Sequence, residues 1–398
     1  MTVREPTQDE DYELHDYAPI ALERYRLLTG HVEWGQACCG ACHHAYRPRE
    51  VIVDDAGRAA VEQLAEVTHA REDAELGLAL LVVDADRDAV SLARAARSFD
   101  PTSLVAPNYI LRPLEHKGGY FPDSVPVPAP EPTRPSAPGA PVTVGVVDTG
   151  VRCDHPWWDG SVTGDDEEAP ATPAEIELGH GTFVVGVLKQ VAPQAAVRVK
   201  GLGAVARLTD WTVAQALREL AGDQAIHVLN VSLGTCAPPD MPPPAMAAAV
   251  AEIQAARGDD VVIVAAAGND ASAEAPYPAA LPGVVAVAAT ADGSPASYSN
   301  YGAWVDVCAE GRWVSAYFHG DVPAFASTPS AGPYCGFALW EGSSFAAPVV
   351  AAKIAEQLAA GAPTARDAMR RVRAASPKRY TRYGRFIPHR PPHGGAPR

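Results

Sequence analysis

The sequence predicts a mostly parallel β-sheet covered by helices on both faces, preceded by a small α+β domain. From residue 142 onward, continuous apolar runs rich in β-branched residues alternate with alanine-rich helical stretches, which is typical of a parallel sheet buried on both sides. Residues 47–113 carry a shorter alternation of strand-like and helix-like segments. Between the two, residues 114–141 contain too many prolines for a central strand or a helix interior, so we interpret them as an extended linker.

The small domain is expected to follow the order βαββαβ. Short apolar runs indicate strands, and apolar residues spaced at 3.6 positions indicate helices. The expected strands are 49–54, 76–84 and 104–113, and the expected helices are 57–70 and 87–98. A further strand within 73–84 would complete a ferredoxin-like arrangement, with two helices on one face of an antiparallel sheet.

The large domain, residues 142–375, supplies the parallel sheet. Its expected strands are 142–148, 196–202, 225–233, 260–268 and 284–290, and helices are expected at 209–222 and 246–258. The two ends of the chain differ from both domains. Residues 1–46 are irregular, and residues 376–398 form a basic, proline-rich tail that either docks on the acidic body or is disordered.

The charge balance excludes general binding to nucleic acids and anionic membranes. The chain has 32 Lys and Arg against 48 Asp and Glu, a formal net charge of −16, whereas those partners require a basic face. No run approaches the roughly 18 apolar residues of a membrane span, and the acidic N-terminus lacks the apolar segment of a signal peptide. The seven cysteines, an odd number, are expected to be reduced, which favours a cytoplasmic protein.

A cluster of cysteines and histidines near the N-terminus leaves two interpretations open. Cys39 and Cys42 have the spacing of a zinc knuckle, and Cys38, His43 and His44 could complete the ligands. Structural zinc sites usually combine two separated pairs, and no second pair follows in this zone. The alternative is a loop of reduced thiols. No cofactor and no catalytic metal is expected elsewhere.

Three polar residues fall where parallel sheets place functional sites, at the carboxyl ends of strands or the starts of helices. Asp148 ends the first strand of the large domain, His180 precedes an apolar helix, and Ser344 opens another helix. Taken singly, Asp148 could be a turn residue, and His180 and Ser344 could be helix caps. Together, in this order on one α/β sheet and each close to a glycine, they indicate a nucleophilic serine with a base and an orienting carboxylate.

Three motifs resemble the signatures of the subtilisin-like serine peptidases, or subtilases: "VVDTGV" at 146–151, "HGTFVVGV" at 180–187 and "GSSFAAPVV" at 342–350. The chain order Asp, His, Ser also agrees with that family. "VLNVSLG" at 228–234 resembles its substrate-binding strand, and "VVIVAAAGN" at 261–269 resembles the segment with its oxyanion asparagine. The resemblance covers about residues 142–360 and implies a subtilisin-like fold and a serine endopeptidase.

The resemblance implies a role for each matching residue. Ser344 is the nucleophile, His180 the general base, and Asp148 the group that orients His180. The side chain of Asn269 and the backbone N–H of Ser344 meet the oxyanion. Ser343 is a support, because the family motif fits only with Ser344 as nucleophile. Pro348 is expected in the first turn of the helix, which places Ser344 at the helix N-terminus.

The resemblance also implies a binding mode for a peptide or protein substrate. The backbone of Ser232, Leu233 and Gly234 would pair with an extended peptide as an added strand. Glu274 and Pro276 fall near the expected floor of the primary specificity pocket, where Asp270 and Glu274 would suit a basic side chain. Residues 313–340 are an aromatic-rich insertion that is expected to cover part of the cleft.

Two departures from the family pattern stand out. Phe183 and Val185 replace two residues of the usual histidine motif, a change that concerns packing more than proton transfer. Between His180 and the strand at 196–202 the chain lacks the loop with which secreted relatives bind calcium, and Lys189 stands there instead.

The domain at 47–113 has the element order of subtilase propeptides, which implies an intramolecular inhibitor and an enzyme made as a precursor. The alternative is an unrelated partner-binding domain. For the whole chain, the alternatives are a catalytically idle, peptide-binding scaffold and a nucleotide-binding protein suggested by "GLGAVAR" at 201–207. That glycine pattern neither follows the first strand nor opens a long helix, so it is weak evidence.

Overall fold

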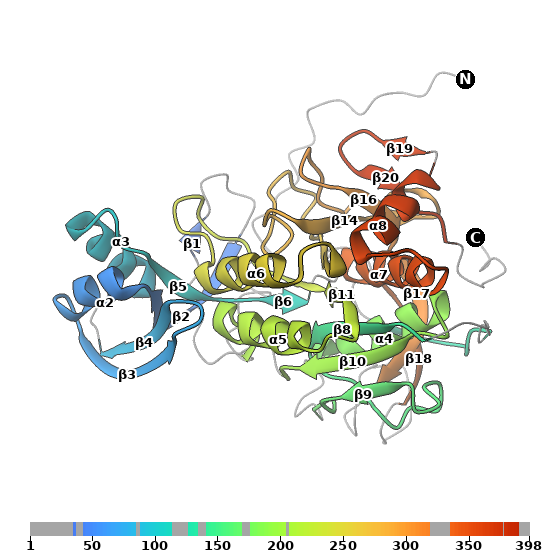
Figure 1. The fold of residues 1–398 in the computed structure, drawn as a ribbon, viewed down its shortest axis with the longest axis horizontal. Coiled ribbons are helices and arrows are strands. Elements are labelled where there is room, and N and C mark those ends of the chain that lie inside the picture. The colour runs from blue at the N-terminus through green and yellow to red at the C-terminus, as the bar shows by residue number, and fades with distance from the viewer. Residues whose placement is uncertain are drawn as a thin grey trace.

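The computed structural model describes residues 35–36, 43–84, 88–113, 126–133, 141–168, 176–203, 207–318, 335–376 and 378–389. Figure 1 shows a small domain beside a larger one, whose central sheet lies between helices. Among the described residues, no helix is both long and apolar enough to cross a membrane.

The larger domain is built on a mostly parallel sheet, which confirms the predicted fold class. Nine strands follow one another in the order β19-β20-β16-β14-β13-β11-β8-β10-β9, and β15 pairs with β14 at one side. The inner strands β10, β8, β11, β13, β14 and β16 are all parallel to one another, and only the short β15 pairs antiparallel with β14 among their described partners. Their bounds are β8 Thr143–Asp148, β9 Val162–Gly164, β10 Ala196–Gly201, β11 Ile226–Val231, β13 Val262–Ala266, β14 Val284–Ala291, β15 Ser294–Pro295 and β16 Val307–Glu310.

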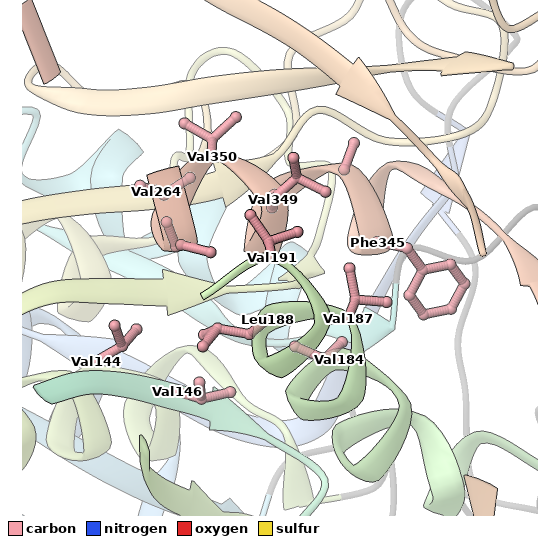
Figure 2. Packing of buried hydrophobic residues seen from close by; sticks show 14 of the residues in the cluster. Val144, Val146, Val184, Val187, Leu188, Val191, Val264, Phe345, Val349 and Val350 are labelled. Atoms are coloured by element: carbon pink, nitrogen blue, oxygen red, sulfur yellow. The ribbon is translucent and has the colours of Figure 1, made fainter. Parts of the chain in front are cut away.

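Helices cover both faces of this sheet because its strands are apolar on both sides. Val144 and Val146 of β8 pack under α4 (His180–Val191) and α7 (Ser343–Ala359), together with Val264 of β13 (Figure 2). Val147, on the opposite side of β8, packs with α5 (Asp210–Gly222) and α6 (Pro244–Arg257). Alternate residues of one strand therefore enter two separate cores. The helix α8 (Ala365–Ala374) joins the core of α4 and α7.

The small domain has the ferredoxin-like strand order β3-β4-β2-β5, with all pairs antiparallel. Its elements are β2 His43–Val53, α2 Asp55–Glu62, β3 Glu66–Asp73, β4 Leu78–Asp84, α3 Ala89–Phe99 and β5 Val105–Ile110, and β1 (Gly35–Gln36) pairs with the start of β2. Two expectations were wrong in detail. The additional strand is β3, which occupies the second half of the expected helix 57–70, and β2 begins before residue 47.

The linker contributes one short edge strand. β7 (Val127–Ala129) pairs with β18 (Cys335–Glu341), which in turn pairs with β17 (Arg312–Phe318). An edge position is where a proline such as Pro128 is tolerated, because only one side of the strand must donate hydrogen bonds. Residues 319–334, within the expected insertion, lie outside the described residues.

The C-terminal tail is docked as far as it is described. β19 (Arg379–Tyr380) and β20 (Gly384–Phe386) extend the main sheet, with β20 parallel to β16. Ile387 is buried, and the His389 ring stacks on Trp313 with centroids 5.6 Å apart. Of the two interpretations of this segment, docking therefore holds for residues 378–389.

Candidate active site

Asp148 and His180 form a buried hydrogen-bonded pair. Asp148 ends β8, and His180 is the first residue of α4. His180 Nδ1 lies 2.8 Å from Asp148 Oδ1, and both side chains are 0% exposed. His180 Nε2 has no hydrogen-bond partner among the described residues. With Nδ1 bound to the carboxylate, Nε2 is the nitrogen left to accept a proton.

Thr149 ties the first turn of α4 to the end of β8. Its backbone N–H donates to Asp148 Oδ1 at 2.8 Å, and its hydroxyl donates to Leu178 O at 2.9 Å. The same hydroxyl oxygen accepts from Gly181 N at 3.0 Å. A Cβ at Gly181 would lie 2.0 Å from Gly150 O, so only glycine allows this close approach. The pairing of His180 with Asp148 is thus fixed by backbone contacts on both sides.

Ser344 is the second residue of α7 and is fully buried. Its hydroxyl does not cap the helix but donates to Ser232 O at 2.8 Å, and the Ser232 hydroxyl donates back to Ser344 O at 2.7 Å. The second bond has a clear cause. In an α-helix Ser344 O would accept from residue 348, but Pro348 has no N–H, so Ser232 supplies the missing donor. Pro348 is the sixth residue of α7, so the expectation that it lies in the first turn was wrong.

An aromatic layer joins the helix starts that carry His180 and Ser344. The His180 ring packs against Phe345 at 5.4 Å and against Trp340 at 5.8 Å between centroids. Phe183 packs on Phe345 at 4.3 Å, so its replacement of the usual family residue concerns this layer. Trp340 belongs to β18, at one end of the aromatic-rich segment 313–340, and that end contacts the histidine. These contacts bring α4 and α7 together at the site.

Asn269 lies in the loop after β13 and faces the start of α7. Its Oδ1 accepts from Ser343 N at 2.8 Å, so the carbonyl end of the amide is fixed against the helix. The Ser343 hydroxyl accepts from Gly268 N at 3.0 Å and does not cap the helix. Ser343 therefore holds the loop that carries Asn269, which is the supporting position that its sequence predicts.

The expected substrate strand is already paired. Leu233 and Gly234 form β12, which pairs antiparallel with β6 (Arg112–Pro113), and Leu233 lies opposite Pro113. Just before β6, the Leu111 N–H donates to Leu208 O at 2.5 Å, and Leu111 is fully buried. The last segment of the small domain thus occupies the position expected for an added peptide strand.

The expected specificity loop lies on the other side of β12. Thr235 N donates to Tyr277 O at 3.0 Å, and Tyr277 N donates to Thr235 O at 2.8 Å. Pro276 is buried and Asp270 and Glu274 are partly exposed. A preference for a basic substrate side chain stays a prediction.

Sequence reasoning missed Glu167, a buried carboxyl group next to the pair of Asp148 and His180. The Thr182 hydroxyl donates to Glu167 Oε2, and Thr182 Oγ1 accepts from Arg152 N at 2.8 Å. Burial raises the pKa of Glu167 well above its usual range, and the nearby Asp148 charge adds to the increase. The acidic run 165–168 was the only signal in the sequence, and it does not reveal which carboxylate turns inward.

Residues 186–196, where the sequence predicts that the calcium loop of secreted relatives is missing, contain a buried lysine. Lys189 is 6% exposed, and its ammonium group donates to Pro193 O at 2.6 Å and to Ala195 O at 2.7 Å. A positive charge that binds the loop carbonyls does not fit a calcium ion at the same place. Among the described residues, no three His, Cys, Asp or Glu side chains gather as a metal site.

Of the four cysteines that the structure describes, one differs from the expectation. Cys236 is disulfide-bonded, whereas Cys153, Cys308 and Cys335 are free thiols. The expectation that all cysteines are reduced was therefore wrong for Cys236. The proposed zinc ligands Cys38, Cys39 and Cys42 lie outside the described residues, as do the side chains of His43 and His44.

Comparisons with known proteins place the larger domain in a family. The model described as "Subtilase family" matches residues 139–376. Subtilisin BL of Lederbergia lenta is 35% identical over 198 residues, which are 47% of this chain and 70% of that protein. Thermitase of Thermoactinomyces vulgaris is 30% identical over 212 residues, which are 50% of this chain and 73% of that protein.

A solved structure extends the similarity in fold. The crystal structure of fervidolysin from Fervidobacterium pennivorans matches with a TM-score of 0.59 at 20% identity, covering 86% of this chain and 60% of that one. This share of the chain is larger than residues 139–398. The similarity in fold therefore includes part of the sequence before the larger domain.

Proposed function

The chain belongs to the subtilase family and is a serine endopeptidase, and we propose that Asp148, His180 and Ser344 are its catalytic triad. The observation that carries the proposal is the buried pair of Asp148 and His180, with His180 Nδ1 2.8 Å from Asp148 Oδ1 and no partner for His180 Nε2 in the part of the chain that the structure describes. Ser344 lies at the start of the helix whose next residue, Phe345, packs on the His180 ring. A serine hydroxyl is a weak nucleophile and requires such a base.

In the proposed acylation step, the Ser344 hydroxyl releases Ser232 O and donates to His180 Nε2. Ser344 Oγ then attacks the substrate carbonyl carbon while His180 accepts the proton. Asp148 accepts the Nδ1–H hydrogen bond, which fixes the tautomer and stabilises the imidazolium ion. His180 next delivers the proton to the leaving amine, and the C–N bond breaks to leave an acyl-enzyme at Ser344.

Two donors are proposed to stabilise the oxyanion. Ser343 N–H donates to Asn269 Oδ1, which fixes the carbonyl end of this side chain, and the amide NH2 end is the first proposed donor. The second donor is the Ser344 N–H in the first turn of α7, where helical N–H groups lack intrahelical partners. One such donor contributes about 3–4 kcal/mol to transition-state stabilisation, a figure established with subtilisin itself. Deacylation repeats these steps with water as the nucleophile and His180 as its base.

The small domain is proposed to be an intramolecular inhibitor of this site. Its last segment, β6, pairs with β12, and a substrate that adds to the same backbone edge has to displace it. A peptide held as an added strand gains affinity from main-chain hydrogen bonds, whatever its sequence. The enzyme would accordingly be made as a precursor that is processed between residues 114 and 141.

Contacts away from the cleft support this proposal. The Tyr109 hydroxyl in β5 donates to Met241 O at 2.8 Å, and Asn108 Oδ1 accepts from Trp211 N at 3.2 Å. Arg218 of α5 binds Asp73 of the small domain at 2.7 Å. The small domain is therefore held against α5 and the segment before α6 as well as at β12.

A cytoplasmic location stays a prediction from the N-terminal sequence. The disulfide at Cys236 points the other way, because disulfides persist in oxidising compartments. Fractionation of cells that express the full chain, with thiol labelling of Cys236 before and after reduction, decides between the two.

The proposal is tested with a fluorophosphonate probe, which labels an activated serine. Wild-type protein and Ser343→Ala should be labelled and should hydrolyse a peptide substrate, and Ser344→Ala should do neither. Loss of the nucleophile should lower kcat by about 10⁶, a magnitude known from subtilisin. Ser343→Ala removes only the acceptor for Gly268 N, so we expect a decrease of less than about tenfold. Equal losses in both variants would contradict the assignment, and an unlabelled wild-type protein would favour an idle scaffold.

A further inference from the structure

Asn300 is a fully buried amide that lies against the loop carrying Asn269. It follows β14 and precedes β16, so it is about thirty residues away in sequence from the groups it contacts. Its Oδ1 accepts from Asp270 N at 2.8 Å and from Ser272 N at 3.1 Å, and its Nδ2 donates to Glu274 O at 3.4 Å. Its backbone N–H donates to Gly268 O at 3.0 Å.

These hydrogen bonds hold the chain on both sides of Asn269. Gly268 and Asp270, the two neighbours of Asn269, are each held directly by Asn300, one through its backbone and one through its side chain. Two flanking residues strengthen the contact, because Tyr298 O accepts from Ala271 N at 2.8 Å and Tyr301 N donates to Ser272 O at 2.9 Å. The loop from 268 to 274 is thus shaped by the segment 298–301.

The contact at Gly268 requires glycine. Gly268 has φ +100°, a left-handed conformation that other residues rarely adopt, and a Cβ there would lie 2.4 Å from Asn300 Nδ2. The sequence therefore provides space for the Asn300 amide directly beside the residue before Asn269. This close approach fixes the position of the Asn269 backbone relative to the sheet.

The other end of Asn269 is fixed by α7. Ser343 N–H donates to Asn269 Oδ1, and the Ser343 hydroxyl accepts from Gly268 N. Asn300 sets where the Asn269 backbone lies, and Ser343 sets how its amide is turned. Both are needed, because an oxyanion donor acts only if its N–H lies within about 3 Å of the position that the oxyanion takes.

We propose that Asn300 is a positioning residue for the oxyanion donor Asn269. It touches neither substrate nor reacting atoms and acts by holding residues 268 and 270 in place. The inference rests on the proposed function of Asn269 and extends it to a residue outside the catalytic motifs.

Asn300→Ala should lower kcat about 10- to 100-fold and leave KM within about threefold. A displacement near 1 Å of a catalytic group costs about 10² in rate, while the backbone of β12 that binds the peptide is unaffected. Removing the Asn269 amide itself should cost about 10²–10³, as known from subtilisin. Peptide hydrolysis is measured on enzyme prepared from the full chain, after processing and release of the small domain, with concentrations of active sites determined by titration.

The decisive comparison is a double-mutant cycle with Asn269→Ala. If Asn300 acts through Asn269, then adding Asn300→Ala to Asn269→Ala should lower kcat by no more than about threefold further. If Asn300 only stabilises the fold, the two losses should multiply. Should Asn300→Ala not fold, Asn300→Ser, which keeps a small polar group at the site, enters the same cycle.

The matched control is Ser299→Ala, at the adjacent and equally buried position. The Ser299 hydroxyl accepts from Ala289 N at 2.8 Å and donates to Asn300 O at 3.1 Å, so its side chain makes no bond to the loop 268–274. We expect a decrease in Tm comparable with that of Asn300→Ala and a kcat within about threefold of wild type.

Three results overturn the inference: Asn300→Ala with kcat within threefold of wild type, losses that multiply in the cycle, or a Ser299→Ala variant that loses as much kcat. Failure of the proposed function looks different. In that case the wild-type protein neither hydrolyses peptides nor reacts with a fluorophosphonate, and the role of Asn300 falls with it.

Discussion

Replacing Lys189 by methionine should destabilise the larger domain, because the Lys189 ammonium group donates hydrogen bonds to two carbonyl groups of the loop between α4 and β10. Lys189 lies in α4 and is 6% exposed. Its Nζ donates to Pro193 O at 2.6 Å and to Ala195 O at 2.7 Å, so it joins the end of the helix to the start of β10. Methionine keeps the apolar stem in place and removes only the charged donor.

The expected loss is about 2 kcal/mol. Hydrogen bonds from a charged group contribute about 1.5–3 kcal/mol each, and the carbonyl left behind loses its partner. Ala195 is buried and its carbonyl stays without a donor, whereas Pro193 is partly exposed and its carbonyl can bind water. Methionine also removes the cost of burying a charge, which offsets part of the loss. In a domain of this size, 2 kcal/mol lowers Tm by about 4–8 °C.

The assay is thermal unfolding in the Ser344→Ala background, which prevents self-digestion. Lys353→Met is the matched control, because Lys353 forms a partly exposed pair with Glu356 one turn along α7, which should contribute less than about 0.5 kcal/mol. The wild-type midpoint should not change between calcium and a chelator, since the ammonium group binds the carbonyls that a cation would need. A chelator-induced decrease traced to an ion at residues 186–196, or a Lys189→Met midpoint equal to that of the control, would refute this reasoning.

Two further predictions concern processing and pH. Wild-type protein should be cleaved between residues 114 and 141 while Ser344→Ala stays at full length, as intact mass measures; cleavage of both would point to another protease. Burial raises the pKa of Asp210 from 3.8 to about 7, so the folded chain binds this proton more tightly than the unfolded chain. The free energy of unfolding should then fall as the pH rises from about 4 to about 7, by up to about 4 kcal/mol, and Asp210→Asn should flatten this slope. Unfolding by guanidinium at pH 4.5 and at pH 7.5 measures this change for the wild type and for Asp210→Asn. An equal dependence of the free energy of unfolding on pH in the two proteins would contradict the argument from burial.

The candidate triad could be located from the sequence because each member lies in a short local motif. Asp148 ends an apolar strand and His180 and Ser344 start apolar helices, and parallel sheets bring such ends to one edge. The structure pairs Asp148 with His180 as that pattern predicts. The catalytic roles themselves stay predictions until the variants are measured.

The features that sequence reasoning missed depend on partners far away in the chain. Nothing near Pro348 indicates that Ser232 supplies the donor that the proline lacks. Asn300 follows a strand and resembles a turn residue until its bonds to residues 268–274 are known. The sequence of β3 resembles the continuation of a helix. Its residues are extended because they pair with β4, and this pairing is not evident from the local sequence.

The small domain is proposed to control the access of substrates to the candidate active site. Ser344 and His180 have no exposed surface in the full chain, and β12 has its backbone edge occupied by β6. A substrate from solution therefore cannot pair with Leu233 and Gly234 until residues 112 and 113 leave. Cleavage of the linker does not by itself remove them, because Tyr109, Asn108 and Asp73 still bind the larger domain. The proposed processing and activation are therefore expected to be separate steps, and activity toward other proteins should follow the release of the small domain and not the cleavage of the linker.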